Sequence, residues 1–252
     1  MVFRGTNNDH GVVTDLQLYR SEVESPEKVE AMTGRNFFKI HHGFRLYLGL
    51  SDTYEVNSTC NHIIDILVQL AENKEENFID YQLYVSGHSL GGAMAQIFAF
   101  MVAGGDRLNK YPMIFPVACL SFASPPVGNQ AYKKSFALLE ERGWIRHLRF
   151  SNQGDPVPVT LPWFEQSGLR IHYLKKGNAT DIRYNINDNF FGQFFNMWHF
   201  QSEFPWINPI YYHGMDVYMD HTEDRSKNLF NDMTLEAFWD QYVVDTKQKH
   251  TK

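Results

Sequence analysis

The sequence predicts an α/β fold in which helices cover both faces of a mostly parallel, doubly wound sheet. Short runs of β-forming residues alternate with longer segments of helical periodicity along the chain. Strands that alternate with helices favour parallel pairing, because a parallel pair needs a long crossover connection. The length of 252 residues is enough to bury one sizeable core. We therefore expect residues 1–252 to form a single α/β domain.

Four segments are rich in β-forming residues and bounded by turn residues, which is typical of buried strands. They are residues 79–86, 116–123, 144–151 and 169–174. Four other segments carry apolar residues at helical spacing. They are residues 52–73, 90–104, 129–141 and 234–246. Asp52 is expected to cap the first helix, with Glu55 three residues further on. The start of the chain, VFRGT at 2–6, reads as the end of another core strand.

Two segments depart from this alternation. Residues 7–36 are polar and only weakly periodic, and residues 184–212 are crowded with aromatic side chains such as Phe190, Phe194 and Trp198. Such an aromatic insert either docks on a lipid surface or forms extra core beneath a long connection. Because aromatic clusters are more often buried, we favour the core interpretation.

The composition argues against several classes of partner. A formal net charge of −6, a pI near 6.0 and the lack of basic runs argue against nucleic acid, since phosphate binding needs clustered Lys and Arg. No apolar run in the sequence reaches the length of a transmembrane segment. Cys60 and Cys119 lie in apolar periodic segments without the spacing of a metal site, so we expect buried free thiols.

The stretch YVSGHSLGGAMAQIF at 84–98 places a serine between two glycines, where a predicted strand meets a predicted helix. This context fits the pattern G-x-S-x-G, in which the serine sits on a tight turn and the glycines avoid clashes. The hydroxyl of Ser89 would then project above the C-terminal edge of the sheet, and the backbone N–H of Leu90 could donate to an oxyanion. We predict that Ser89 is a nucleophile rather than a capping residue in a glycine-rich turn.

A serine nucleophile needs a histidine to take its proton and a carboxylate to orient that histidine. In hydrolases with this turn the acid follows a later strand, and the histidine follows the acid. Asp155 comes just after the predicted strand 144–151, in a loop stiffened by two prolines. An aspartate before proline is also common in ordinary turns. The chain order favours the catalytic role for Asp155.

Five histidines follow the predicted acid and are candidate bases: His172, His199, His213, His221 and His250. His172 falls within a predicted strand, His199 in the aromatic insert and His250 in a polar tail. His213 follows an apolar run and precedes Gly214, which suggests a loop-like setting. We predict His213 as the base, with His221, in a charged stretch, as the second choice.

Taken together, these residues resemble the class 3, fungal-type lipases of the α/β-hydrolase fold. Five local matches carry the resemblance and occur in the family's order. They are VFRGT at 2–6, IHHGF at 40–44, GHSLGGA at 87–93, FASPPVGNQAY at 122–132 and DPVPVTLP at 155–162. A sixth segment, HGMDVY at 213–218, is similar to the family's terminal histidine segment more loosely. The chain departs from the family at Pro126, where arginine is usual.

The resemblance implies a serine esterase that acts on acyl esters of lipids without a metal or cofactor, with a lipid–water interface as a possible partner surface. It also implies that Thr6 joins Leu90 in the oxyanion hole, that His41 has a structural place, and that a lid lies at about residues 7–20. The family has further elements before this first strand, so we expect the sheet to lack N-terminal strands at one edge. The aromatic insert at 184–212 is not part of the shared pattern.

The predicted function is therefore a lipase-like serine hydrolase that works through an acyl-enzyme. Two alternatives stay open at this point. One is a phospholipase, galactolipase or other carboxylesterase, which differs in the ester it accepts. The other is a non-catalytic lipid-binding protein that keeps the hydrolase fold, against which the set of Ser89, Asp155 and a later histidine argues.

Overall fold

The structure is a computed structural model that describes most of the chain. The described ranges are 1–5, 19–50, 58–72, 82–111, 114–161, 163–174, 179–184, 209–231 and 233–249. Thr6, all but two residues of the expected lid at 7–20, and most of the aromatic insert at 184–212 lie outside these ranges. Whether the whole chain forms one domain therefore stays a prediction.

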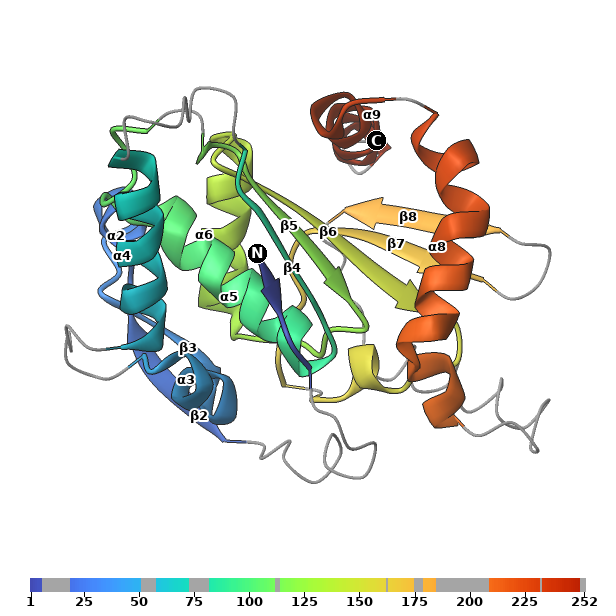
Figure 1. The fold of residues 1–252 in the computed structure, drawn as a ribbon, viewed down its shortest axis with the longest axis horizontal. Helices are drawn as coiled ribbons and strands as arrows, with labels where there is room; N and C mark the ends of the chain where they lie inside the picture. Colours follow the sequence, from blue (N-terminus) through green and yellow to red (C-terminus); the bar gives the residue numbers. More distant parts are fainter. Residues whose placement is uncertain are drawn as a thin grey trace.

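A six-stranded sheet forms the centre of the described structure (Figure 1). Its strands follow the order β1, β4, β5, β6, β7, β8. Their bounds are Val2–Phe3 (β1), Tyr84–His88 (β4), Val117–Phe122 (β5), Ile145–Asn152 (β6), Leu169–Tyr173 (β7) and Thr180–Tyr184 (β8). All neighbouring pairs are parallel except β7 with β8, which is antiparallel. The predicted mostly parallel sheet is thus confirmed, and β1 forms one of its edges.

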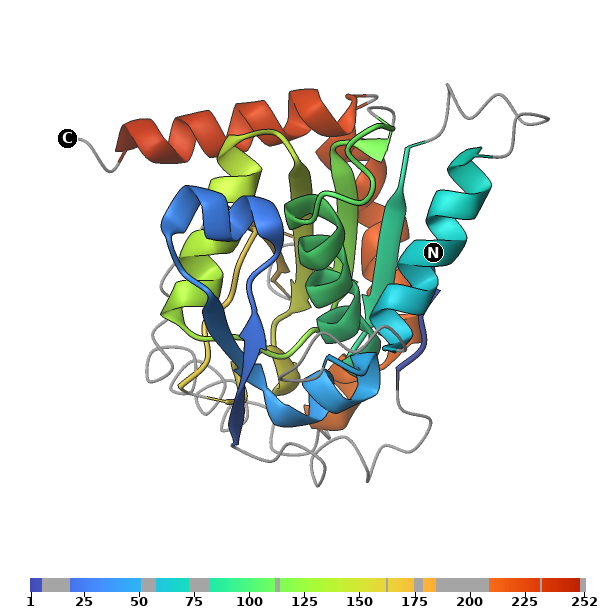
Figure 2. The same cartoon turned by 90° about the vertical axis from the view of Figure 1, so that its left-hand side faces the viewer.

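Helices cover both faces of this sheet, as predicted. One face carries α5 (Leu90–Gly104) and α6 (Gln130–Glu141), with α4 (Thr59–Glu72) outside them. Figure 2 looks onto this face, with α8 (Met215–Phe230) behind the sheet and α9 (Leu235–Lys249) running across the top. Asn129 caps α6 by accepting a hydrogen bond from Tyr132 N–H. None of the described helices is both long and apolar enough to cross a bilayer.

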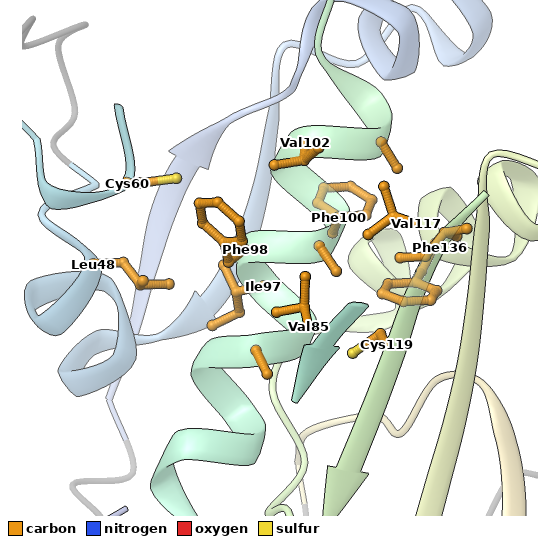
Figure 3. Packing of buried hydrophobic residues seen from close by; sticks show 14 of the residues in the cluster. Leu48, Cys60, Val85, Ile97, Phe98, Phe100, Val102, Val117, Cys119 and Phe136 are labelled. Atoms are coloured by element: carbon orange, nitrogen blue, oxygen red, sulfur yellow. The ribbon is translucent and has the colours of Figure 1, made fainter. Parts of the chain in front are cut away.

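The core is split by the sheet into two clusters of buried side chains. The first surrounds α5, which is buried along nearly its whole length. In Figure 3, Phe98 of α5 lies on the side of Cys60, whereas Phe100 faces Phe136 of α6. The second cluster joins the opposite face of the sheet to α8 and α9 through residues such as Tyr218 and Trp239. Burial of a helix on all sides explains why α5 reads as a nearly continuous apolar run.

Both cysteines are buried and free, as predicted. Burial raises the pKa of the Cys60 thiol to about 12 and raises the pKa of Cys119 still further. A thiol reacts through its thiolate, so neither side chain is reactive at neutral pH.

The polar region at 7–36 and the residues after it hold elements that the periodicity did not reveal. They are β2 (Arg20–Glu24), α2 (Glu27–Thr33), β3 (Phe37–His41) and α3 (His42–Leu48). Strands β2 and β3 form a separate antiparallel pair. Each is five residues long and α2 buries only Val29, so the apolar pattern is too short to be distinctive. Strand β8 and helix α8 were missed for a similar reason: each is largely polar.

The first predicted helix begins later than expected. Helix α4 begins at Thr59, and Ser58 Oγ accepts a hydrogen bond from Asn61 N–H at 3.0 Å. A serine directly before the apolar face supplies the cap, so the predicted start at Asp52 is wrong. Asp52 and Glu55 themselves lie outside the described residues.

One buried histidine in β6 makes the stability of the fold depend on pH. The His147 side chain is fully buried against the Phe136 ring, and its Nε2 lies 2.8 Å from Ser121 Oγ. Burial, aided by the charge of Arg149, lowers the pKa of His147 from 6.5 to about 3. Below pH 6.5 the unfolded chain therefore binds a proton that the folded chain does not.

We predict that the free energy of unfolding falls as the pH is lowered from about 6.5 towards 3, with His147 contributing up to about 1.4 kcal/mol per pH unit. Replacing His147 with Gln should reduce this slope in urea titrations between pH 7 and 4. His62→Gln, at an exposed position on α4, is the matched control and should leave the slope unchanged. Equal slopes in the wild type and H147Q would contradict the prediction.

Candidate active site

Ser89 occupies a strained turn between β4 and α5. Its backbone has φ 56° and ψ −126°, which a residue with a side chain rarely adopts and which costs about 1–3 kcal/mol. The turn is held by hydrogen bonds on both sides: Ser89 N–H donates to Phe122 O at 2.9 Å, and Ser89 O accepts from Gly92 N–H and Ala93 N–H. The strand-to-helix turn predicted for this serine is therefore present.

The glycines that flank Ser89 allow the backbone to pack against itself. A Cβ atom on Gly87 would lie 2.2 Å from Gly91 O, and one on Gly91 would lie 2.3 Å from Phe3 O. Both distances are far shorter than any real Cβ contact. The pattern G-x-S-x-G is needed here because α5 starts directly against β4 on one side and against β1 on the other.

His213 lies beside the serine although the two residues are far apart in the chain. It ends the 3-10 helix η5 (Pro209–His213), and Gly214 separates it from α8, so its setting is a helix end rather than the expected loop. His213 Nε2 is 2.9 Å from Ser89 Oγ. Its Nδ1 is 3.1 Å and 3.2 Å from the two carboxylate oxygens of Asp155. With Nδ1–H donating to the carboxylate, Nε2 is available to accept the serine proton.

The carboxylate of Asp155 is buried and fully hydrogen-bonded. Oδ1 accepts from Val157 N–H at 2.9 Å, and Oδ2 accepts from Tyr218 O–H at 2.6 Å. The Asp155 side chain has 0% exposure. Burial and the neighbouring Asp155 charge raise the pKa of Tyr218 well above its ordinary value, so this phenol remains a donor. These contacts hold the carboxylate toward His213 in a water-poor setting.

Asn152, at the end of β6, ties the acid loop to the helices that follow the insert. Its N–H donates to Tyr218 Oη at 2.9 Å, and its amide Nδ2 donates to Tyr212 O at 3.2 Å. Its carbonyl oxygen accepts from Asp155 N–H. Neither Asn152 nor Tyr218 was singled out from the sequence, although both lie in the segments that carry the predicted acid and base.

The other candidate histidines lie elsewhere. His172 Nδ1 pairs with Ser151 Oγ at 2.8 Å, and His221 Nδ1 pairs with Asn152 Oδ1 at 2.9 Å. His199 and His250 lie outside the described residues. Of the histidines after Asp155 that the structure describes, His213 is the one that contacts Ser89, and His221 supports the neighbouring asparagine instead.

The expected oxyanion donors are only partly within the described chain. Leu90 is the first residue of α5, so its N–H belongs to the first turn, where backbone donors have no partner within the helix. Thr6 lies outside the described residues, but the preceding Gly5 packs on the turn: a Cβ there would lie 2.7 Å from His88 O. The chain therefore approaches the serine directly before Thr6. The described residues contain no cluster of metal-ligating side chains.

A continuous strip of backbone hydrogen bonds fixes the acid loop from its far side. Ile40 of β3, Gly128 and Glu165 pair in turn as isolated antiparallel bridges. Glu165 N–H donates to Gly128 O at 2.7 Å, and the buried Lys133 side chain of α6 pairs with Glu165 at 3.3 Å. The β2–β3 pair, absent from the sequence prediction, therefore braces the loop that follows Asp155.

The fold and this row of side chains define an α/β hydrolase whose Ser89, His213 and Asp155 meet at the C-terminal edge of parallel strands. The sequence comparison then gives the family: the profile for Lipase (class 3) matches residues 1–165, and the chain belongs to this family.

Sequence relatives match about two thirds of the chain. A chloroplastic galactolipase of Arabidopsis thaliana (DONGLE) is 30% identical over 172 residues, which are 65% of this chain and 33% of the galactolipase. A lipase of Rhizopus niveus is 26% identical over 164 residues, 64% of this chain and 34% of that lipase. The chain thus spans about a third of the length of these curated relatives. Rhizomucor miehei triacylglyceride lipase has the same fold, with a TM-score of 0.55, 19% identity, and coverage of 83% of this chain and 67% of that one.

We predict that Tyr218→Phe lowers the free energy of unfolding by about 1–3 kcal/mol, because it leaves Asn152 N–H and Asp155 Oδ2 buried without this partner. Chemical denaturation measures the change. Tyr173→Phe is the matched control, since the Tyr173 hydroxyl makes a longer contact, 3.4 Å to Thr222 Oγ1. A loss no larger in Y218F than in Y173F would contradict the role given to Tyr218.

Proposed function

We propose that this chain is a serine hydrolase that cleaves carboxylic esters of lipids in the manner of a triacylglycerol lipase. One observation carries the proposal: Ser89 Oγ, the His213 imidazole and the Asp155 carboxylate form a continuous hydrogen-bonded row. A serine on a strained turn, a histidine within 2.9 Å of its oxygen and a buried carboxylate behind that histidine are the parts that nucleophilic acyl transfer needs.

In the proposed reaction Ser89 Oγ attacks the ester carbonyl while His213 Nε2 takes the hydroxyl proton. Asp155 holds Nδ1–H and stabilises the imidazolium that forms. The negative charge on the carbonyl oxygen is stabilised by Leu90 N–H at the start of α5, together with Thr6. His213 then donates its proton to the leaving alcohol, and water hydrolyses the acyl-enzyme by the reverse steps. This route calls for no metal and no cofactor.

The substrate class in the proposal rests on the relatives. They are named as a triacylglyceride lipase, a galactolipase and phospholipases A1, and the bond common to all three is a carboxylic ester of a glycerolipid. We therefore propose an acyl-ester lipid as substrate, met at a lipid–water interface. A galactolipase or phospholipase is the second candidate, favoured by the 30% identity to the galactolipase.

We predict that Ser89→Ala lowers kcat for p-nitrophenyl butyrate and palmitate by about 10⁴-fold or more, because the variant has no nucleophile. Ser135→Ala removes another buried serine hydroxyl, on α6, and should keep wild-type activity. A folded S89A protein with full activity would disprove the serine mechanism. A folded wild type with no activity would favour the non-catalytic lipid-binding alternative.

We also predict that replacing the base is far more damaging than replacing the second candidate histidine. His213→Gln should cost about 10³-fold or more in kcat, whereas His221→Gln should cost less than about tenfold, because His221 pairs with the supporting Asn152 and not with Ser89. The reverse order of the two histidine variants would make His221 the base.

Rates with matched triacylglycerol, galactolipid and phospholipid dispersions would show which ester is preferred.

A further inference from the structure

We infer that His88, the residue directly before the nucleophile, is a positioning residue that holds the base in place through a hydrogen bond to its backbone. The inference rests on the proposed function and extends it to a residue that acts through His213 rather than on the substrate. The bare pattern G-x-S-x-G leaves this position open and assigns it no role.

The contact that carries the inference runs from a ring to a backbone atom. His88 Nε2 lies 2.8 Å from the backbone oxygen of His213. A carbonyl oxygen can only accept, so the hydrogen must reside on His88 Nε2. The two imidazole rings also face each other, with centroids 4.8 Å apart and planes tilted by 41°. His88 therefore touches both the backbone and the ring of the proposed base.

This contact links the base to the same backbone that carries the nucleophile. His88 ends β4, and Ser89 follows it directly. His213 thus has two attachments to neighbouring residues: its Nε2 meets Ser89 Oγ at 2.9 Å, and its carbonyl oxygen meets His88 Nε2 at 2.8 Å. The Asp155 carboxylate already orients the ring at Nδ1, and the His88 contact adds a hold on the backbone from which that ring extends.

The location of His213 explains why such a tether matters. It lies at the end of η5, a five-residue 3-10 helix, a form with weaker hydrogen-bond geometry than an α-helix. Reacting groups displaced by about 1 Å can lose about 10²-fold in rate. A donor supplied by the rigid end of β4 compensates for the weak local structure around the base.

The electrostatic environment favours the neutral form of His88. Burial lowers the pKa of His88 below its ordinary value, and the facing His213 lowers it further; the hydrogen bond to His213 and the charge of Asp155 act in the opposite direction. Tyr218, whose ring is 5.7 Å away, stays protonated. Among the described residues, these are the titratable groups that face His88. A neutral His88 places no cation beside the imidazolium that forms on His213.

Three uncharged substitutions at position 88 test separately whether the N–H donor, the length of the side chain or its bulk is what matters. His88→Leu keeps the bulk but has no N–H, and it should lower kcat by about 10- to 10²-fold with little change in KM. His88→Gln places an amide nitrogen where Nε2 stood and should restore kcat to within a few-fold of wild type. His88→Asn has the same amide on a shorter side chain and should remain close to the Leu variant. If His88→Gln alone restores kcat, the hydrogen bond to His213 is the feature that matters. If His88→Gln and His88→Leu lose kcat equally, the inference is overturned and packing of the ring explains the effect.

A charged variant gives a second readout. His88→Lys keeps an N–H donor but adds a fixed cation beside His213. The acid limb of its pH–rate profile should move to lower pH relative to His88→Gln, because the cation opposes protonation of the base. An acid limb at the same pH in both variants would contradict the claim that the site depends on a neutral residue 88. Thermal melts of all four variants show that each is folded.

Amide hydrogen exchange over residues 211–215 tests the tether without using catalysis. Exchange there should be faster in His88→Leu than in wild type and His88→Gln, while exchange in β5 stays constant. Unchanged exchange in His88→Leu overturns the inference even if the enzyme is active. Faster exchange in His88→Leu, together with a wild type that hydrolyses no ester and whose Ser89 resists a fluorophosphonate, would support the tether and reject the proposed function.

Discussion

The candidate active site depends on one close approach of backbone to backbone, at the turn that joins β4 to α5. Ser89 can hold a positive φ there because Gly87 and Gly91 leave no Cβ atoms in the way and because hydrogen bonds from β5 and α5 fix the turn on both sides. The sheet is packed tightly enough to compensate for the strain. Everything else in the site is placed relative to that serine: the first strand passes beside it, and the first turn of α5 starts from it.

The base and the acid reach the serine through a chain of buried polar contacts rather than through apolar packing. Asn152 connects the end of β6 to η5 and α8, and Tyr218 extends that connection to the Asp155 carboxylate. Each of these groups is satisfied by a partner from another segment, which is the condition under which buried polar groups specify a single arrangement. The β2–β3 pair supports the acid loop from the opposite side through Gly128.

Much of the fold was predictable because its strongest signals are local. The buried strands and α5 carry long apolar patterns, and the turn around Ser89 has a motif whose glycines are dictated by sterics. Asp155 and His213 could be ranked from chain order. The structure places His213 beside Ser89 and Asp155 beside His213, and their catalytic roles remain proposals. The parts that were missed are short or polar. Strand β2 buries one apolar residue, Val23, and β3 buries two, Phe38 and Ile40. Helix α8 has a largely charged sequence, and Tyr218 is one of the few apolar side chains that it buries. No local pattern shows that Asn152 will join segments 60 residues apart.

Helix α8 and η5 bring His213 to the site from the far end of the chain, yet among their described side chains few are buried compared with those of α5. Segments of this kind open at a lower free energy than the core against which they rest. We therefore expect α8 and η5 to separate from the sheet at a lower temperature than the one at which the sheet itself unfolds. If His213 is the base, as proposed, the protein would then lose activity on heating while the sheet, the serine turn and the acid loop are still folded.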